Sequence, residues 1–313
     1  MKTPLLLNVG TCFSASSPLH YTLGWDNKYC HTGHCKEHHY LYIMQIGKKK
    51  WKKTAEKYKR RREKDEYVYK PPLLTGESHL VNNVLFPRGE ETIEKYINYY
   101  KQLWECIKPE YAACADFSNK HFQLTESFMM KIKDQLLDAF DLKFMMVLRD
   151  PVRRLFSACS NACQHSVGHD ILGERDDLVD PVKYFRYCVS DYIEPNTQYT
   201  EVYNKFTKVW GKERVHAIIM EELWNPETQP EQMEKLSDFL NFPITKVHEN
   251  VYYPDMGPNA PKYEYLKDQW CSDTVGLDKE TWKYGMEHMD WIYSGFAKIF
   301  GYIPKEWGEW YET

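Results

Sequence analysis

Short apolar runs alternate with longer segments of helical periodicity along most of the chain. Residues 144–148 form a charge-free run of the length expected for a strand buried on both faces. Residues 5–9, 111–116 and 214–220 predict further strands. Strands that alternate with helices favour a parallel sheet. We therefore expect an α/β fold of three layers, a mostly parallel sheet flanked by helices, in a single domain over residues 1–313.

Helices are expected where apolar positions recur every three or four residues. The predicted helices cover about residues 91–107, 124–140, 152–159, 181–191, 198–210, 229–240 and 279–300. The last is expected to stop at Gly301, because glycine readily takes the left-handed conformation that ends many helices.

Composition narrows the possible partners and the compartment. The net charge is −4 and the pI is about 6.3, so no global basic field attracts nucleic acid or membranes. No apolar run approaches the roughly 18 residues of a membrane span, and no signal peptide is visible. The nine cysteines are scattered and do not resemble a small disulfide framework. We expect a reduced, cytoplasmic protein without a nucleic-acid partner or a transmembrane segment.

Polar residues suited to an anion follow three of the predicted strands. Arg149 comes directly after residues 144–148, Asp150 can cap the next helix and Pro151 fits its first turn. Ligands of open α/β sheets bind at the carboxyl ends of strands, and Ser157 can offer a hydroxyl to the same ligand. The alternative is a surface arginine on an ordinary turn.

The other two strand ends are residues 10–17 and 116–120. Residues 10–17 form a turn of small and hydroxyl residues, after which Pro18 opens a helix with Ser17 as its cap. Backbone N–H groups and the helix dipole favour an anion in such a turn. The turn is not the usual nucleotide-triphosphate loop, because GxxxxGK[ST] is absent.

Residues 29–41, YCHTGHCKEHHYL, are rich in histidine and cysteine. Residues 36–40 read as a strand with Glu37 and His39 on one side. A zinc alternative takes Cys30, His34 and His38, or His31, Cys35 and His39, at helical spacing. These spacings match no standard structural zinc pattern, so we expect no metal.

A basic segment interrupts the alternating pattern at about residues 47–70. Eleven Lys or Arg lie between Lys48 and Lys64, against two Glu. We interpret the segment as a helical insertion within the domain, either a solvated surface helix or an arm for an acidic substrate.

Several stretches, taken in order, resemble the sulfotransferases that use 3′-phosphoadenosine 5′-phosphosulfate (PAPS), especially the bacterial and carbohydrate-type branch with its P-loop-like fold. They are LLNVGTCFSASSPL, CKEHHYL, ADFSNKHFQL, VLRDPVRRLFSACSN, MEELW, LSDFLNFP and FAKIFGYIP. The resemblance covers most of the chain outside the basic insertion, and RDPVRRLFS is its most specific motif. It implies transfer of a sulfuryl group to a hydroxyl or amine acceptor without a metal, leaving 3′-phosphoadenosine 5′-phosphate.

The resemblance also implies roles for individual residues. Arg149 and Ser157 match the pair that binds the 3′-phosphate, and Glu37 matches the general base of the carbohydrate branch. The segment from Tyr253 to Lys262 corresponds to the one that closes over the cofactor. The loop that cradles the 5′-phosphosulfate corresponds to Gly10, Thr11, Cys12, Phe13, Ser14, Ala15, Ser16 and Ser17.

The chain departs from the family pattern within that loop. Phe13 stands where the family usually has a basic residue that contacts the leaving oxygen, and Ala15 replaces a glycine. The candidates to supply the charge are Lys36, Lys120 and Lys262. Two alternatives to a sulfotransferase stay open: a nucleotide-dependent kinase on the same kind of sheet, and a non-catalytic homologue that binds acidic glycans. The acceptor, carbohydrate or small metabolite, and the oligomeric state stay open too.

Overall fold

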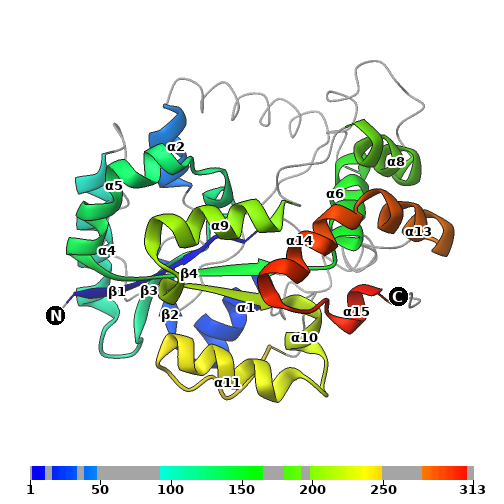
Figure 1. The fold of residues 1–313 in the computed structure, drawn as a ribbon. Coiled ribbons are helices and arrows are strands. Elements are labelled where there is room, and N and C mark those ends of the chain that lie inside the picture. The colour runs from blue at the N-terminus through cyan, green and yellow to red at the C-terminus, as the bar shows by residue number, and fades with distance from the viewer. Residues whose placement is uncertain are drawn as a thin grey trace.

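The computed structural model describes residues 2–10, 16–33, 39–47, 92–164, 180–191, 198–248 and 277–308. Five strands in these ranges form a parallel sheet in the order β2-β3-β1-β4-β5 (Figure 1). Their bounds are Thr3–Asn8 (β1), Cys30–His31 (β2), Ala113–Asp116 (β3), Phe140–Leu148 (β4) and Val215–Ile219 (β5). The α/β class and the mostly parallel sheet are therefore confirmed.

Helices cover both faces of the sheet. The first part of the chain holds α1 (Ser16–Tyr21), η1 (Thr22–Asp26), α2 (Tyr40–Ile46), α4 (Ile93–Ile107), η3 (His121–Gln123), α5 (Glu126–Ala139) and α6 (Pro151–Gln164). The second part holds α8 (Pro181–Asp191), α9 (Tyr199–Trp210), η6 (Lys212–Arg214), α10 (Met220–Trp224), α11 (Gln229–Leu240), α13 (Lys279–His288), α14 (Asp290–Phe300) and α15 (Lys305–Gly308).

The side chains of the central strands alternate between two cores, which gives the three layers. On β1, Leu5 and Leu7 belong to the core under α4, α5, α6, α9 and α14, whereas Leu6 belongs to the core under α1, η1 and α11. On β4, Met146 belongs to the first of these cores and Met145 to the second. Strands buried on both faces explain the charge-free runs in the sequence.

Strand β4 is longer than the apolar run that predicted it. It begins at Phe140, and its first residues alternate between buried Phe140 and Leu142 and the more exposed Asp141 and Lys143. This alternation follows the pleat at a point where only one face is covered. Because Asp141 and Lys143 interrupt the apolar run, the sequence pattern did not predict this part of the strand.

The helix predicted over residues 279–300 is two helices, so that prediction was wrong in its continuity. The chain turns at Met289, whose side chain is fully buried, between α13 and α14. Both helices pack against the same core, so their apolar positions continue one pattern across the turn. Gly301 ends α14 in a left-handed conformation with φ of 82°, as predicted.

Two local predictions near the amino terminus were also wrong. Helix α1 begins at Ser16, so Ser17 lies inside it and Pro18 is its third residue, still among those whose N–H has no partner within the helix. Tyr40 begins α2, so the strand expected over residues 36–40 does not include it. The basic insertion at 48–70 lies outside the described residues.

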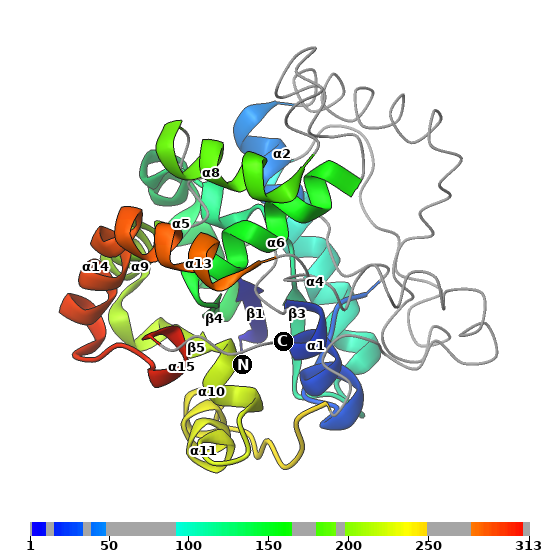
Figure 2. The same ribbon diagram turned by 90° about the vertical axis from the view of Figure 1, so that its right-hand side faces the viewer.

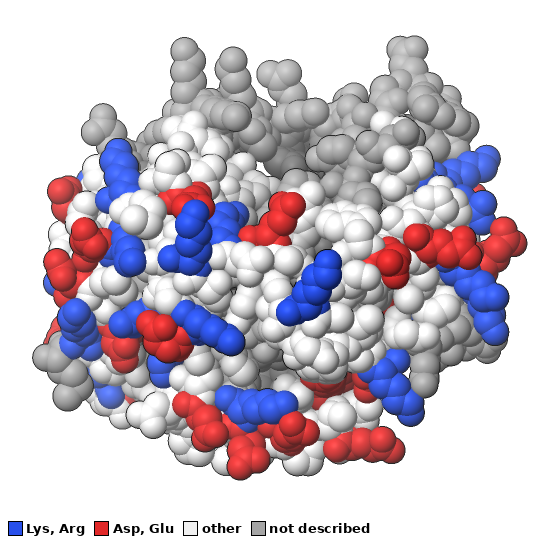
Figure 3. Space-filling view, in the orientation of Figure 1, with Lys and Arg blue, Asp and Glu red and all other residues white. Residues whose placement is uncertain are grey.

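Among the described residues on the face in Figure 3, opposite charges are interspersed and no large patch of one sign gathers. Within the described ranges, no helix is long and apolar enough to cross a bilayer.

Candidate functional site

The carboxyl ends of β1 and β4 lie side by side at the centre of the sheet. Val9 donates a hydrogen bond to the carbonyl of Met145, at 2.7 Å. From β1 the chain continues toward β2 on one side, whereas from β4 it continues toward β5 on the other. Ligands of open α/β sheets bind where strand connections diverge in this way. Figure 2 shows β1 and β4 beside each other at this edge. Gly10, two residues after β1, and Arg149, directly after β4, therefore flank the switch point.

Arg149 and Ser157 belong to the strand–turn–helix unit of β4 and α6. Asp150 caps α6, because its Oδ1 accepts a hydrogen bond from the backbone N–H of Arg153 at 2.8 Å. Arg149 is only 6% exposed and Ser157 only 1% exposed. The Ser157 Oγ is buried and has no hydrogen-bond partner in the described structure. A buried hydroxyl without a partner is costly, so it calls for an explanation such as an ordered water or a ligand atom.

The start of α6 is rich in buried positive charge. Arg153 and Arg154 are buried together with Arg149. Burial raises the pKa of Asp150 to about 7, and the negative charge of Glu221 adds to the rise, whereas the charges of Arg153 and Arg149 oppose it.

Burial also raises the pKa of Glu221, against hydrogen bonds from Trp307 and Asp150 and the charge of Arg149. A pKa of about 7 leaves Asp150 partly protonated near neutral pH and less able to cancel the arginine charge. This electrostatic balance favours an anionic ligand.

Gly10 lies at the end of β1 and is tightly enclosed. Its N–H donates to the Asn8 Oδ1 at 3.1 Å. A Cβ added to Gly10 would lie 2.7 Å from that oxygen, so a larger residue would displace the Asn8 side chain. The structure therefore explains why glycine stands at the start of the loop that was predicted to hold the phosphosulfate.

The third strand end is committed to internal contacts. The Asp116 carboxylate accepts hydrogen bonds from the Ser118 N–H at 3.0 Å, from the Ser118 hydroxyl and from the Tyr96 hydroxyl at 3.2 Å. His121 lies 3.5 Å from Asp116 through Nε2 and donates from Nδ1 to the Asn8 carbonyl at 2.9 Å. These contacts tie the end of β3 to the end of β1. They hold the start of the loop that follows β1, so the role of Asp116 is structural.

Ser118 also binds the chain that follows the predicted general base. The backbone N–H of His39 donates to the Ser118 Oγ at 2.7 Å. Glu37 stands two residues before His39 in the sequence, and Lys36 three. Both lie outside the described residues, so their predicted roles stay predictions.

Of the other predicted site residues, some lie in the described ranges and others do not. Ser16 and Ser17 lie in the first turn of α1, although their side chains are not described. Outside the described ranges are Thr11, Cys12, Phe13, Ser14, Ala15, Tyr253 and Lys262.

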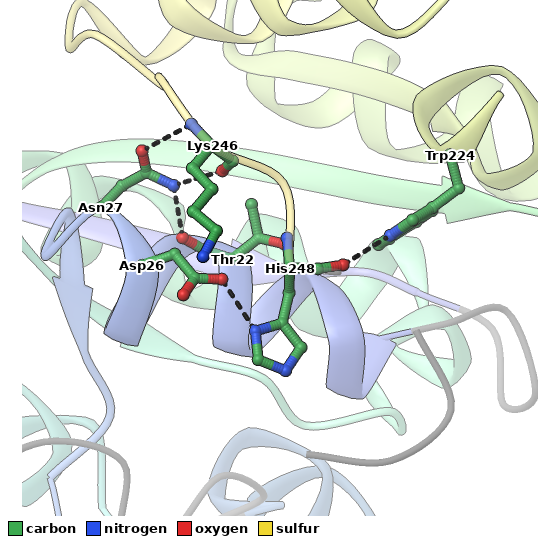
Figure 4. Close-up of polar contacts among 6 residues, drawn as sticks. All are labelled: Thr22, Asp26, Asn27, Trp224, Lys246 and His248. Atoms are coloured by element: carbon green, nitrogen blue, oxygen red, sulfur yellow. Dashed lines mark hydrogen bonds and ion pairs between the residues drawn. The ribbon is translucent and has the colours of Figure 1, made fainter. Parts of the chain in front are cut away.

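Residues 245–248 lead toward the predicted closing segment and are held against η1 (Figure 4). Asn27 accepts a hydrogen bond from the N–H of Thr245 at 2.9 Å and donates to the Lys246 carbonyl at 2.7 Å. His248 lies 2.8 Å from the Asp26 carboxylate through Nδ1, and its backbone N–H donates to the Thr22 hydroxyl at 3.0 Å. These contacts fix where the chain leaves the core after β5 and α11.

The zinc alternative needs its ligands spaced along a helix, and the first two of them do not lie on one. Cys30 and His31 form β2, and the His31 Nδ1 accepts a hydrogen bond from Gly33 at 2.9 Å. Residues 34, 35 and 38 lie outside the described part of the chain. Among the residues that are described, no three His, Cys, Asp or Glu side chains gather as metal ligands.

Sequence reasoning missed the residues that support Arg149 from distant parts of the chain. Tyr199, Glu221, Tyr293 and Trp307 all contact Arg149 or Asp150, directly or through one another. The only signal in the sequence was the acidic pair after the strand at 215–219. Aromatic residues of surface helices carry no mark of such a role.

No protein-family model matches the chain, and no curated protein sequence matches it. Several solved structures do match the chain. A sulfotransferase from Alicyclobacillus acidocaldarius has a TM-score of 0.50 and 18% identity, and the match covers 99% of this chain and 100% of that one. The sulfotransferase domain from the curacin biosynthetic pathway has a TM-score of 0.48 and 17% identity, over 92% of this chain and 97% of that one. The first likeness shows that the chain has the fold of a sulfotransferase.

Proposed function

We propose that the protein is a sulfotransferase that moves a sulfuryl group from PAPS to a hydroxyl or amine acceptor, with a carbohydrate or small metabolite as the favoured acceptor. Two observations carry the proposal: Arg149 is buried at the switch point of the sheet, and the buried hydroxyl of Ser157, two turns into the helix that follows, has no partner among the described residues. The shared fold supports it.

The chemistry of these two residues fits a phosphate ester. A guanidinium donates two parallel hydrogen bonds to a phosphate, and a hydroxyl adds a third donor. In our proposal, Arg149 and Ser157 bind the 3′-phosphate of PAPS. The bound phosphate would satisfy the Ser157 Oγ, which the described residues leave without a partner.

The loop from Gly10 to Ser17 would hold the 5′-phosphosulfate. The tight enclosure of Gly10 and the first turn of α1 fit this role, because a helix N-terminus favours anions. Because Phe13 stands where the family usually has a basic residue, the loop itself offers no cation to the leaving oxygen. We propose that Lys36, Lys120 or Lys262 supplies it, and Tyr253 and Lys262 would contact the cofactor from the closing segment.

Glu37 would act as the general base. PAPS supplies the activated sulfuryl group, already attached to a phosphate leaving group. Glu37 would take the proton of the acceptor hydroxyl as its oxygen bonds to sulfur, while the sulfur–oxygen bond to the 5′-phosphate breaks and its electron pair stays on that phosphate. Such in-line displacement depends on positioning and on cationic stabilisation of the leaving group. No step requires a metal.

Labelled PAPS and a panel of sugar, amine and phenol acceptors test this proposal. We expect label to be transferred to at least one acceptor class. We expect Glu37→Gln to lower turnover by about two orders of magnitude with cofactor affinity unchanged, as for a general base. Equal losses of turnover and cofactor affinity would instead make Glu37 structural.

Two further outcomes would favour the alternatives. Binding of 3′-phosphoadenosine 5′-phosphate without transfer to any acceptor would favour the non-catalytic homologue, which the substitution at Phe13 makes a specific alternative. Turnover of ATP with magnesium and without PAPS would favour the kinase.

A further inference from the structure

The peptide group between Arg149 and Asp150 is held at both of its polar atoms by side chains. The Arg149 carbonyl accepts a hydrogen bond from the Tyr199 hydroxyl of α9 at 2.6 Å. The Asp150 N–H donates to the Glu221 Oε1 of α10 at 2.9 Å. Strand pairing stops one residue earlier, where Leu148 is opposite Ile219. This peptide therefore lies beyond the sheet ladder and depends on side chains for its partners.

A second layer of contacts fixes the side chains that hold this peptide. The other Glu221 oxygen, Oε2, accepts a hydrogen bond from the Trp307 indole N–H of α15 at 2.9 Å. The Tyr293 hydroxyl of α14 donates to the Asp150 Oδ2 at 3.3 Å. Tyr199, Tyr293 and Trp307 are all buried, and the Trp307 ring packs tilted against Tyr199 and edge-on against Tyr293. Side chains from four helices between residues 199 and 308 thus converge on one peptide group.

The two contacts satisfy the buried N–H and carbonyl, which would be costly without partners. They also tie both ends of the peptide to side chains of other helices. A carboxyl oxygen of Glu221 and the phenol of Tyr199 thus hold the two ends of one peptide plane. A fixed plane restricts the backbone torsions on either side of it, and these set the direction in which the Arg149 side chain leaves the backbone. Bidentate recognition of a phosphate requires that direction to be correct to within about 10–20°.

We infer that Tyr199 and Glu221 are positioning residues that orient Arg149 for a phosphate on the ribose 3′-oxygen, and that Trp307 holds Glu221 for this task. The inference rests on the proposed function and deepens it, because it assigns the discrimination between a 3′-phosphorylated nucleotide and a plain 5′-nucleotide to contacts behind the site. Tyr199 and Glu221 act through the Arg149–Asp150 peptide and do not touch the ligand.

Two conservative variants test this role. Tyr199→Phe removes the hydrogen bond to the Arg149 carbonyl and retains the ring. Glu221→Gln retains the shape, but its amide has one oxygen for two N–H donors, so its NH₂ must face either Asp150 or Trp307. Tyr203→Phe is the matched control, because Tyr203 is a buried tyrosine one turn along the same helix and lies away from the peptide.

The readout is the ratio of dissociation constants for adenosine 5′-phosphate and adenosine 3′,5′-bisphosphate, measured by calorimetry on the full chain. A general loss of structure lowers both affinities, whereas misdirection of Arg149 lowers only the second. We expect Tyr199→Phe and Glu221→Gln each to reduce the ratio by about tenfold, equivalent to one hydrogen bond. Tyr203→Phe should leave it unchanged.

Each result has one consequence. Unchanged ratios in both variants, with a wild-type protein that prefers the bisphosphate, would overturn the positioning role and leave the proposed function intact. A wild-type protein with no preference for the bisphosphate would overturn the proposed function, and this inference with it. If Glu221→Gln does not fold, Tyr199→Phe alone decides, since it removes a single oxygen atom.

Discussion

Ser157 is the residue at which ligand binding and stability make opposite demands. Its hydroxyl is buried without a partner among the described residues, so it costs the free protein energy and benefits only a bound ligand. We predict that Ser157→Ala raises the free energy of unfolding of the ligand-free protein by about 1 kcal/mol and weakens adenosine 3′,5′-bisphosphate binding by about tenfold. Chemical denaturation and calorimetry measure the two effects.

The control for this variant is Ser294→Ala on α14, whose hydroxyl lies at the surface and bonds to Asp290 of its own helix. It should leave the affinity unchanged. A Ser157→Ala protein that is less stable and binds the bisphosphate equally well would show that the hydroxyl serves the helix and not a ligand.

Asp150 is the residue whose ionisation links stability to pH. Its pKa rises from an ordinary value of 3.8 to about 7 in the folded protein, chiefly through burial. The folded state therefore keeps a proton that the unfolded state loses, and stability falls as pH rises from about 4 to 7. Asp150→Asn retains the helix cap without the ionisation. We predict that this variant gains stability relative to the wild type by roughly 1 kcal/mol per pH unit across that window.

Denaturation at several pH values from 4 to 8 measures this difference. Asp278→Asn provides a contrast, because the backbone N–H of Thr281 lowers the pKa of Asp278 below its ordinary 3.8, so the effect of this variant on stability should stay constant from pH 4 to 8. A constant difference between wild type and Asp150→Asn would mean that the carboxyl stays ionised across the whole window.

The elements of the central sheet were predictable because their pattern has one physical cause. Strands buried on both faces must be apolar, so residues 5–9 and 144–148 stood out. The prediction weakened where burial was one-sided, as at the start of β4, and where two helices shared one core, as at Met289. Tertiary packing decides both points, and a local pattern does not contain it.

At the scale of elements, Asn27 joins the turn after η1 to the segment after α11. Its side-chain amide donates to the carbonyls of Thr22 and Lys246 (Figure 4). Its oxygen accepts a hydrogen bond from the Thr245 N–H. We predict that Asn27→Ala lowers the free energy of unfolding by about 2 kcal/mol, because several backbone groups lose their partner together. Asn204→Ala, an exposed position on α9, should change it by less than about 0.5 kcal/mol. Equal effects would show that the two segments are held by packing alone.

At the scale of the whole molecule, the sheet order turns separate motifs into one site. The sequence has a turn suited to an anion after residues 5–9 and an arginine after residues 144–148. Neither motif indicates the order of the strands in the sheet. The structure places β1 beside β4, so the two motifs meet where the connections diverge. The supporting contacts from Tyr199, Glu221 and Trp307 were beyond prediction, because they join residues far apart in the sequence.

The central claim is that the carboxyl edge of this sheet binds a nucleotide 3′-phosphate through Arg149. Calorimetric titration of adenosine 3′,5′-bisphosphate into wild type, Arg149→Ala and Arg186→Ala tests it most directly, since Arg186 is a surface arginine on α8 paired with Glu280. We predict binding to wild type and Arg186→Ala, and about a hundredfold loss for Arg149→Ala, as expected for a bidentate charged contact. Equal affinity of Arg149→Ala and wild type, or no binding to wild type, would contradict the account.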